Sequence, residues 1–442
     1  MIGSLRCTGR ATEWLASGRS GVPYLCLFLA LILSACATYQ PGTLAPEVYL
    51  ARAGSETQDG VTVTSAALSA AEAATLFGVN LADDDIQPVW IEVENREDAS
   101  YWYMHRFTDP MYFSPVEVAF ANRRWFAAEA NQRMAEVFYQ RSLQGYVPPQ
   151  STVAGFVYTS RDPGTKVVSV NLLGDEQMKV FDFILFSPDL AADHRRVDLD
   201  SLHGPDEVRE VDEAELREAL ERLPCCPTNA GGSRHADPLN FVLMGDSDAI
   251  LAALVRAGWD ETEILSAGSV AATAESFLFG SRYRYSPVSP LHLFGRPQDA
   301  AFQKARGDIN RRNHLRLWLA PLRHDGEEVW IGQISRDIGV RFTTSTWNLT
   351  THAIDPDVDA ERWYLAQDLA SVNALSKYGL VGGVGVSTMT EPRVNAGGDP
   401  YFTDGLRAVL FVASEPVPIT EVQWLDWREE PTPAERATLL GE

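Results

Sequence analysis

The chain has 442 residues, of which 45% are apolar, and its formal net charge at pH 7 is −23. This apolar fraction is large enough to build hydrophobic cores, which excludes a disordered stalk, and the length fits two or three domains. Such an acidic composition lacks the basic surface that nucleic-acid binding requires, so no nucleic acid is expected among the partners.

The N-terminal segment predicts export from the cytoplasm. Arginines precede an apolar run, Val22–Leu33, whose twelve residues suit the core of a signal peptide. The run is too short for a membrane-spanning helix, which needs about 20 residues. It leads into Ser34-Ala35-Cys36, which fits the bacterial lipobox pattern. In that pattern the chain is cut between Ala35 and Cys36, and the cysteine thiol then receives a diacylglycerol group. An uncleaved anchor with a chance cysteine is the alternative.

Acylation of Cys36 would make the mature chain a lipoprotein of the cell envelope that faces the periplasm. Two or three acyl chains, palmitate among them, anchor a protein stably, whereas one chain binds a membrane only marginally. Ala37, and not aspartate, follows the cysteine, and the resemblance to sorted lipoproteins then implies the outer membrane over the inner one. Residues 1–35 carry three arginines and one glutamate, a net of +2, so their removal changes −23 to −25. We therefore expect the lipid, and not electrostatic attraction, to hold the body at a membrane.

Two neighbouring cysteines, Cys225 and Cys226, remain in the body of the mature chain. In an oxidising compartment we expect them to form a vicinal disulfide. Two free buried thiols are a second interpretation. Metal binding is a third and weaker one, because a structural zinc site needs four ligands at wider spacing.

The front half of the mature chain predicts a β-sandwich. Residues 36–83 are expected to form a tether that contains a short helix at Ala70–Phe77. Residues 84–195 hold short runs in which apolar and polar residues alternate, such as Val89–Asn95, and this is the period of a strand. A helical pattern at 115–145 is expected to be an insertion in the sandwich.

The sandwich is followed by a charged segment, residues 196–236, which is expected to be a linker. It carries an amphipathic helical pattern at Glu213–Leu223 and then the cysteine pair. The last residues, 416–442, are expected to be a C-terminal tail.

Residues 237–415 predict an α+β domain with a mixed sheet and about three helices. A strand at Leu239–Met244 leads into a helix at Ala249–Ala257, which Gly258 ends. Two further helices are expected, at Val270–Phe279 and Ala360–Leu375. Four further strands are expected, at 315–322, 328–335, 339–344 and 405–412. A strand and helix followed by hairpins is typical of an α+β layer.

Several segments of this domain resemble one known family. They are Asp237-Pro238-Leu239-Asn240, Ala257-Gly258-Trp259, and the stretches 289–304, 311–318 and 351–363. Together they look like the LssY C-terminal domain family, over roughly residues 237–412. Members of that family carry this domain beside membrane modules of the DedA and lipid-phosphatase types. The resemblance therefore implies a membrane setting but no particular activity. The front half looks like an accessory domain of lipoprotein members.

A basic island lies within residues 294–318, where six cations against two acids give a net charge of +4. Its candidate anion-binding residues are Arg296, Lys304, Arg306, Arg312 and Arg316. Arginine binds phosphate oxygens in pairs, and His314 among these residues could move a proton near neutral pH. The alternative is a structural network in which these cations pair with the acids of residues 355–361.

That acidic segment carries Asp355, Asp357 and Asp359 at alternate positions. An EF-hand loop would need glycine and glutamate where Ala360 and Ala366 stand, so an EF-hand is excluded. A looser cation site with His352 is one interpretation. The other is a helix start, with Asp357 or Asp359 as the N-cap.

These features favour a binding or accessory lipoprotein that recognises an anionic ligand, such as a lipid phosphate or sugar phosphate, without a cofactor. One alternative is a phosphoester hydrolase that uses His314 and His352 for proton transfer and Asp355 to hold a divalent cation. Another is a structural or secretion-associated component of the envelope.

Overall fold

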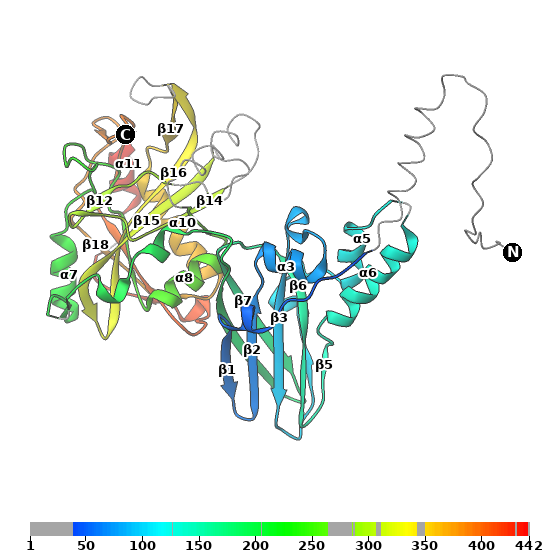
Figure 1. Cartoon of the computed structure of the whole chain (residues 1–442). Helices are drawn as coiled ribbons and strands as arrows, with labels where there is room; N and C mark the ends of the chain where they lie inside the picture. The colour runs from blue at the N-terminus through cyan, green and yellow to red at the C-terminus, as the bar shows by residue number, and fades with distance from the viewer. Residues whose placement is uncertain are drawn as a thin grey trace, which may run out of the picture.

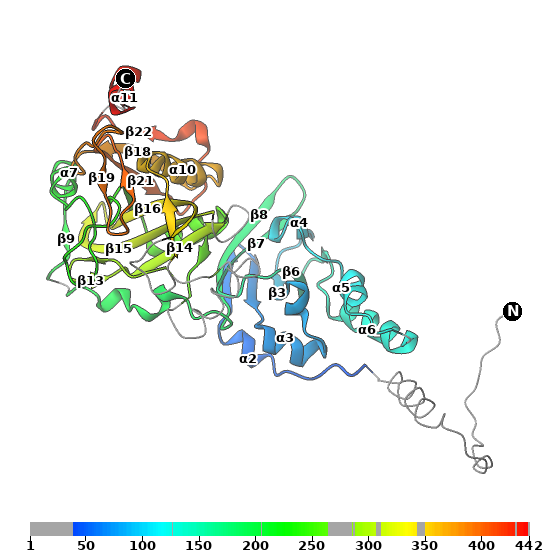
Figure 2. The same cartoon turned by 90° about the horizontal axis from the view of Figure 1, so that it is seen from above.

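The computed structural model describes residues 39–125, 127–204, 206–263, 285, 288–305, 311–342, 350–428 and 431–440. These residues form two domains that lie side by side (Figure 1 and Figure 2). The predicted signal peptide, Cys36, Arg306 and the predicted helix at Val270–Phe279 lie outside the described residues. Helices and mixed sheets occur together, which confirms the predicted α+β class.

The N-terminal domain is a sandwich of two four-stranded antiparallel sheets. The first sheet has the order β1 (Gly54–Gln58), β2 (Val61–Ala67), β3 (Ile86–Asn95) and β6 (Ser151–Ser160). The second has the order β5 (Tyr146–Val147), β4 (Tyr101–Tyr103), β7 (Thr165–Leu173) and β8 (Met178–Phe186). Alternate residues of both sheets, such as Val63, Ile91 and Val170, meet in one core.

The expected tether at residues 36–83 is wrong for its second half, because β1 and β2 are strands of the sandwich. They form a hairpin in which Val61 and Val63 are fully buried, whereas Thr62 and Thr64, which alternate with them, are not. The turn holds Asp59 at a positive φ of 51° and Gly60 after it. An Asp-Gly pair before an alternating strand is a hairpin signal, and it was available in the sequence.

Short helices complete this domain. They are α2 (Glu47–Leu50), α3 (Ala70–Phe77), η2 (Leu81–Asp84), α4 (His105–Thr108), α5 (Pro115–Ala121) and α6 (Ala128–Arg141). The insertion predicted at 115–145 contains α5 and α6, and α4 precedes them between β4 and β5. Ser114 begins α5 through a capping box with Glu117, and Pro115 takes the first position of the helix. Met134 and Phe138 of α6 pack against the first sheet.

The C-terminal domain is built on one mixed sheet. Along its main path the order is β11 (Asp260–Glu261), β14 (Ala300–Ala305), β15 (Arg312–His324), β16 (Glu327–Phe342), β10 (Phe241–Met244), β21 (Arg407–Val412), β18 (Leu375–Val381) and β22 (Gln423–Trp424). Strand β10 pairs in parallel with β21 and antiparallel with β16. The remaining short strands are β9 (Arg209–Glu210), β12 (His292–Leu293), β13 (Arg296–Pro297), β17 (Thr350–Ile354), β19 (Arg393–Val394) and β20 (Pro400–Tyr401).

Helices cover both faces of this sheet. On one face α8 (Ser247–Arg256) and α10 (Val358–Ser371) pack against Phe241 and Leu243, and on the other α7 (Glu213–Glu221) packs against Val242. The described helices also include η3 (Asp193–Arg196), η4 (Leu199–Ser201), η5 (Ile419–Glu421) and α11 (Pro433–Leu440). None of the helices in the described part of the chain is long and apolar enough to cross a membrane.

The expected linker and tail are also wrong in part, since both contribute to the C-terminal domain. Leu216 and Leu220 of α7 are fully buried on the sheet, and β9 pairs with β15. From the tail, β22 pairs with β18 at one edge of the sheet, and Trp427 donates its indole N–H to Glu213 over 2.7 Å. An amphipathic helix cannot leave its apolar stripe in water, and this is why residues 213–221 pack on the sheet.

Candidate ligand site

Three basic residues lie in a row on β15. Successive residues of a strand point to opposite faces, so Arg312, His314 and Arg316 share one face. The residues between them face the helices α8 and α10, where Leu315 and Leu317 join the core. All three residues are buried, with less than 8% of each residue exposed. We call these three residues the basic row.

At the Arg312 end of the row, which we call the outer end, the contacts centre on Asp337 of β16. The Arg312 Nε donates to Asp337 Oδ2 over 3.2 Å, and its Nη1 donates to Gln303 Oε1 over 2.5 Å. His314 Nδ1 lies 3.5 Å from Asp337 Oδ1. Burial raises the pKa of Asp337 to about 6, against the opposing effect of the Arg312 charge. Neutralisation of Arg312 by this carboxylate therefore weakens as the pH falls toward 6.

The inner end of the row is built around Arg316. Its Nη1 donates to Gln333 Oε1 over 2.7 Å and its Nε to the Ser289 carbonyl over 3.1 Å. Burial lowers the pKa of Arg316 to about 10, although the nearby carboxylate of Asp237 opposes this. Asp237 itself accepts hydrogen bonds from Ser335 (2.9 Å) and Asn395 (2.7 Å), and burial raises its pKa.

The other cations of the predicted island are not part of this row. Arg296 makes a two-pronged ion pair with Asp299, at 2.9 and 2.8 Å, and donates to the Leu319 carbonyl. Lys304 pairs with Asn313 across the strands, so it faces α10, where it donates to Asp368 over 2.7 Å. The cations of the island therefore lie in three separate environments, which are the basic row, the Arg296–Asp299 pair and the Lys304–Asp368 pair. Arg306 lies outside the described residues.

The acidic segment serves the start of α10. Asp357 is the N-cap and accepts from the backbone N–H groups of Asp359 and Ala360, as one sequence interpretation predicted. Asp355 accepts from the backbone of Asp357, and Asp359 pairs with Arg362. The predicted ion-pair network between the basic island and the acids of residues 355–361 was wrong in its acidic partners. Arg296, Lys304 and Arg312 pair instead with Asp299, Asp368 and Asp337.

The proposed cation site receives no support from this arrangement. Within the described ranges, no group of three or more His, Cys, Asp or Glu side chains could hold a metal ion. Asp355, Asp357 and Asp359 each have a structural task instead. The backbone of His352 lies in β17, but its side chain lies outside what the structure describes.

The cysteine pair lies close to the inner end of the row. Cys225 and Cys226 form a disulfide, and the Tyr401 hydroxyl lies 4.0 and 3.8 Å from their sulfur atoms. Tyr401 belongs to the β19–β20 hairpin, whose turn also supplies Asn395 to Asp237. The disulfide and the basic row therefore belong to one polar region of the domain.

Sequence reasoning missed the acidic and amide partners of the row. They are Asp237, Gln303, Gln333, Ser335, Asp337 and Asn395. One signal was present, since Gln333, Ser335 and Asp337 stand at alternate positions of a strand whose other face carries Trp330 and Ile334 in the core. Buried polar residues at the strand period indicate a polar cluster on that face.

The fold and the row together define a two-domain α+β protein with a buried basic site in its second domain. Residues 217–406 match the family model described as LssY C-terminus, as the motifs of this domain predicted. The match begins inside α7 and includes the cysteine pair, in keeping with the packing of that segment on the sheet. No curated protein is similar enough to the chain to match it.

Two buried carboxyls make the stability depend on pH. Burial raises the pKa of both Asp337 and Asp359 from 3.8 to about 6, so the folded state binds their protons more tightly than the unfolded state. Their contribution is fully present below about pH 4 and is lost as the pH rises through 6. The free energy of unfolding should therefore fall between pH 5 and pH 7.5. We expect Asp337→Asn to reduce this fall by about 1.4 kcal/mol.

Urea unfolding of both proteins at the two pH values measures this difference. Asp325→Asn is the matched control, because the Asp325 side chain is 80% exposed. An Asp337→Asn protein with the same pH dependence as the parent would contradict the assignment.

Proposed function

We propose that this protein is an envelope lipoprotein, anchored through Cys36, whose LssY C-terminal domain binds an anionic ligand of the phosphate type. The observation that carries the ligand proposal is the basic row, where Arg312, His314 and Arg316 share one face of β15. Arginine presents paired N–H groups that fit two phosphate oxygens, and a partly buried setting strengthens such contacts.

The carboxyls beside the row support an anion rather than a cation as the ligand. Asp337 and Asp237 are buried, and burial raises the pKa of each, so both resist carrying a negative charge. The two guanidiniums stay charged at any physiological pH. An anionic ligand would supply the negative charge that these carboxyls supply only reluctantly.

Titration of the mature chain with inorganic phosphate and with glycerol 3-phosphate, followed by calorimetry, tests the ligand. We expect Arg312→Gln and Arg316→Gln each to weaken binding about tenfold or more, since each removes charged hydrogen bonds. Arg323→Gln is the control, because Arg323 lies on the same strand, its side chain is 47% exposed and it pairs with Glu328. Circular dichroism checks that each variant is folded.

Equal affinity in the parent and both row variants would contradict the site. Release of phosphate from a phosphomonoester in the same samples, lost in His314→Ala, would favour the hydrolase instead. The observation behind that second function is the His314–Asp337 pair, which has the form of an oriented proton-transfer group.

The anchor is tested in the cell. The lipobox pattern at Ser34-Ala35-Cys36 supports acylation of Cys36, and Ala37 supports sorting to the outer membrane. We expect the parent chain to sediment with membranes and to take up labelled palmitate, whereas Cys36→Ser takes up none and its body is released in soluble form. A Cys36→Ser chain that stays in the membrane fraction would contradict the anchor. Ser34→Ala, which keeps the cysteine, is the control.

A further inference from the structure

Exposed apolar side chains gather on the helical insertion, α4 to α6. Trp125 is 79% exposed and Phe120 is 63% exposed, although both are large and apolar. Other exposed members of this surface are Phe107, Met111, Tyr112, Val116 and Tyr139. Large exposed apolar groups mark an interaction surface, since their contact with water is unfavourable. Val116 and Phe120 are four residues apart on α5, so they lie on one side of that helix.

The described chain begins at the base of the same insertion. Tyr39 is 2% exposed and its hydroxyl donates to the Phe77 carbonyl over 2.6 Å. The Phe77 ring stacks on Phe138 of α6, with centroids 4.8 Å apart. Arg141, at the end of α6, donates to the Gly42 carbonyl. Both views show the first coloured residues beside α5 and α6 (Figure 1 and Figure 2).

Two residues, Ala37 and Thr38, separate Cys36 from Tyr39, and this three-step connection spans at most about 10 Å. Lipid on Cys36 would therefore hold the base of the insertion within about 10 Å of the bilayer. A long connection between the lipid and the fold would leave the body free to rotate. Here the connection is short, because Tyr39 is already packed in the fold. The end of α6, with α3 beside it, would therefore be held close to the membrane.

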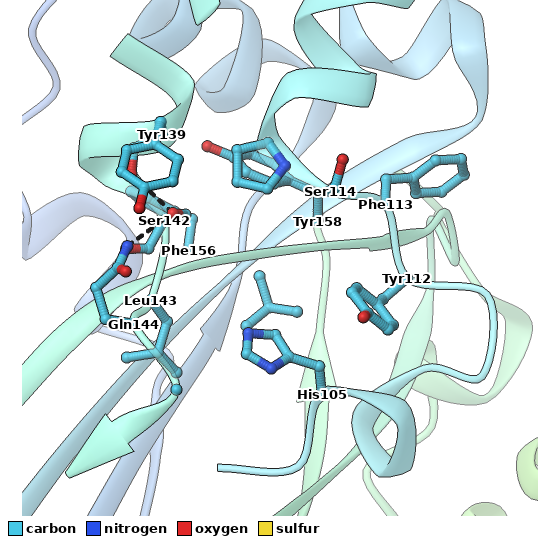
Figure 3. Close-up of a pocket in the computed structure, with 13 residues that line it drawn as sticks. His105, Tyr112, Phe113, Ser114, Tyr139, Ser142, Leu143, Gln144, Phe156 and Tyr158 are labelled. Carbon is cyan, nitrogen blue, oxygen red and sulfur yellow. Dashed lines mark hydrogen bonds between the residues drawn. The ribbon is translucent and has the colours of Figure 1, made fainter. Parts of the chain in front are cut away.

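A cavity of about 260 Å³ opens beside the insertion (Figure 3). His105 and Tyr139 lie on different sides of it, and Tyr112 also lines it. Burial lowers the pKa of His105, which favours its neutral form near pH 7. Neutral histidine and tyrosine side chains have an apolar body and a polar tip, and such groups suit the boundary between headgroups and acyl chains.

The charge of the insertion also differs from that of the whole chain. Residues 105–141 carry five arginines and four acids, a net of +1 within a chain of −23. The Arg123 guanidinium lies over the Phe120 ring at 3.9 Å and near the Trp125 ring at 5.9 Å. An arginine beside exposed aromatic rings can contact lipid phosphates while the rings enter the interface.

We propose that the α4–α6 insertion is a membrane-docking surface that lies on a phospholipid bilayer, with Val116, Phe120 and Trp125 in the interface. The proposal rests on the lipid anchor at Cys36 proposed above, because that anchor brings the insertion to the membrane. The insertion would bind the bilayer surface itself. The lipid anchor would keep that surface close to the insertion and so raise its effective concentration.

A chemical anchor tests the surface without relying on acylation in the cell. Because Cys225 and Cys226 are joined in a disulfide, Cys36 is the free thiol of the chain that begins there. The oxidised chain 36–442 is coupled through this thiol to a maleimide phospholipid in vesicles of phosphatidylethanolamine and phosphatidylglycerol. A share of the acyl chains is brominated, since bromine quenches the fluorescence of tryptophan that lies close to it.

We expect bromine-dependent quenching in the parent protein and loss of most of it in Trp125→Phe. Trp424→Phe is the matched control, because Trp424 is 68% exposed but lies in the other domain. Val116→Ser combined with Phe120→Ser is expected to reduce the quenching of Trp125, whereas Ile419→Ser, at a position 66% exposed, is not.

Absence of quenching in the coupled parent protein would overturn the docking surface, and so would equal losses in the two tryptophan variants. Failure of the lipid anchor in the cell would appear only in the fractionation of Cys36→Ser. The two proposals therefore fail in different experiments.

Discussion

Arg362→Ala is expected to lower the free energy of unfolding by about 3–5 kcal/mol, because it leaves buried carboxylates without their counter-charge. The Arg362 side chain is fully buried. It makes ion pairs with Asp359 (2.8 Å) and with both oxygens of Asp404, and it donates to the Leu406 carbonyl over 3.1 Å. These contacts join α10 to the loop before β21.

Urea unfolding followed by circular dichroism measures this loss. Arg222→Ala is the control, since Arg222 is an exposed partner of Glu218 on α7 and such pairs contribute roughly 0.5 kcal/mol or less. Arg362→Lys keeps the charge but loses the forked geometry, and we expect it to fall between the two. A loss no greater than that of the control would show that the network does not stabilise the fold.

Arg407→Ala is expected to cost a similar amount, about 3–5 kcal/mol, and to release the segment that carries the disulfide. The Arg407 side chain is fully buried on β21. It donates hydrogen bonds to backbone carbonyls, those of Leu220, Leu223, Pro224, Leu239 and Gly382. Burial lowers the pKa of this guanidinium to about 10, so it remains charged at neutral pH.

Arg407 therefore attaches the end of α7 and the cysteine pair to the sheet. Hydrogen exchange of residues 213–226, measured beside urea unfolding, reports both effects of the substitution. Arg393→Ala is the control, because Arg393 is an exposed residue that donates to the Val384 carbonyl near the same disulfide. Protection of residues 213–226 that is unchanged in Arg407→Ala would contradict the role of this side chain.

Elements with a clear local period could be predicted from the sequence. The alternation in Val89–Asn95 marks β3, and the helices α3, α8 and α10 fall where periodicity and capping residues place them. The expected helix Ala360–Leu375 extends too far, since α10 ends at Ser371 and Leu375 begins β18. The local signal was Asn373, which follows the end of the helix in the left-handed conformation with φ 59°.

Contacts between distant segments could not be predicted in this way. The helix α7 was assigned to a linker because its attachment depends on Arg407, 187 residues away from Leu220. The basic row was found because its residues are close together in the sequence. Its partners, Asp237 and Asp337, reach the row only through the register of β10, β15 and β16, which local composition does not encode.

The contact between the two domains fixes the distance between the insertion and the basic row. Glu261 of the C-terminal domain is 3% exposed and accepts from the Thr165 hydroxyl of the sandwich over 2.7 Å, while Arg256 pairs with Asp182. In both views the sandwich lies between the insertion and the C-terminal domain (Figure 1 and Figure 2). With the insertion on the bilayer, the sandwich would act as a spacer of fixed length. The basic row would then meet ligands that have already left that membrane, or that approach from the periplasm.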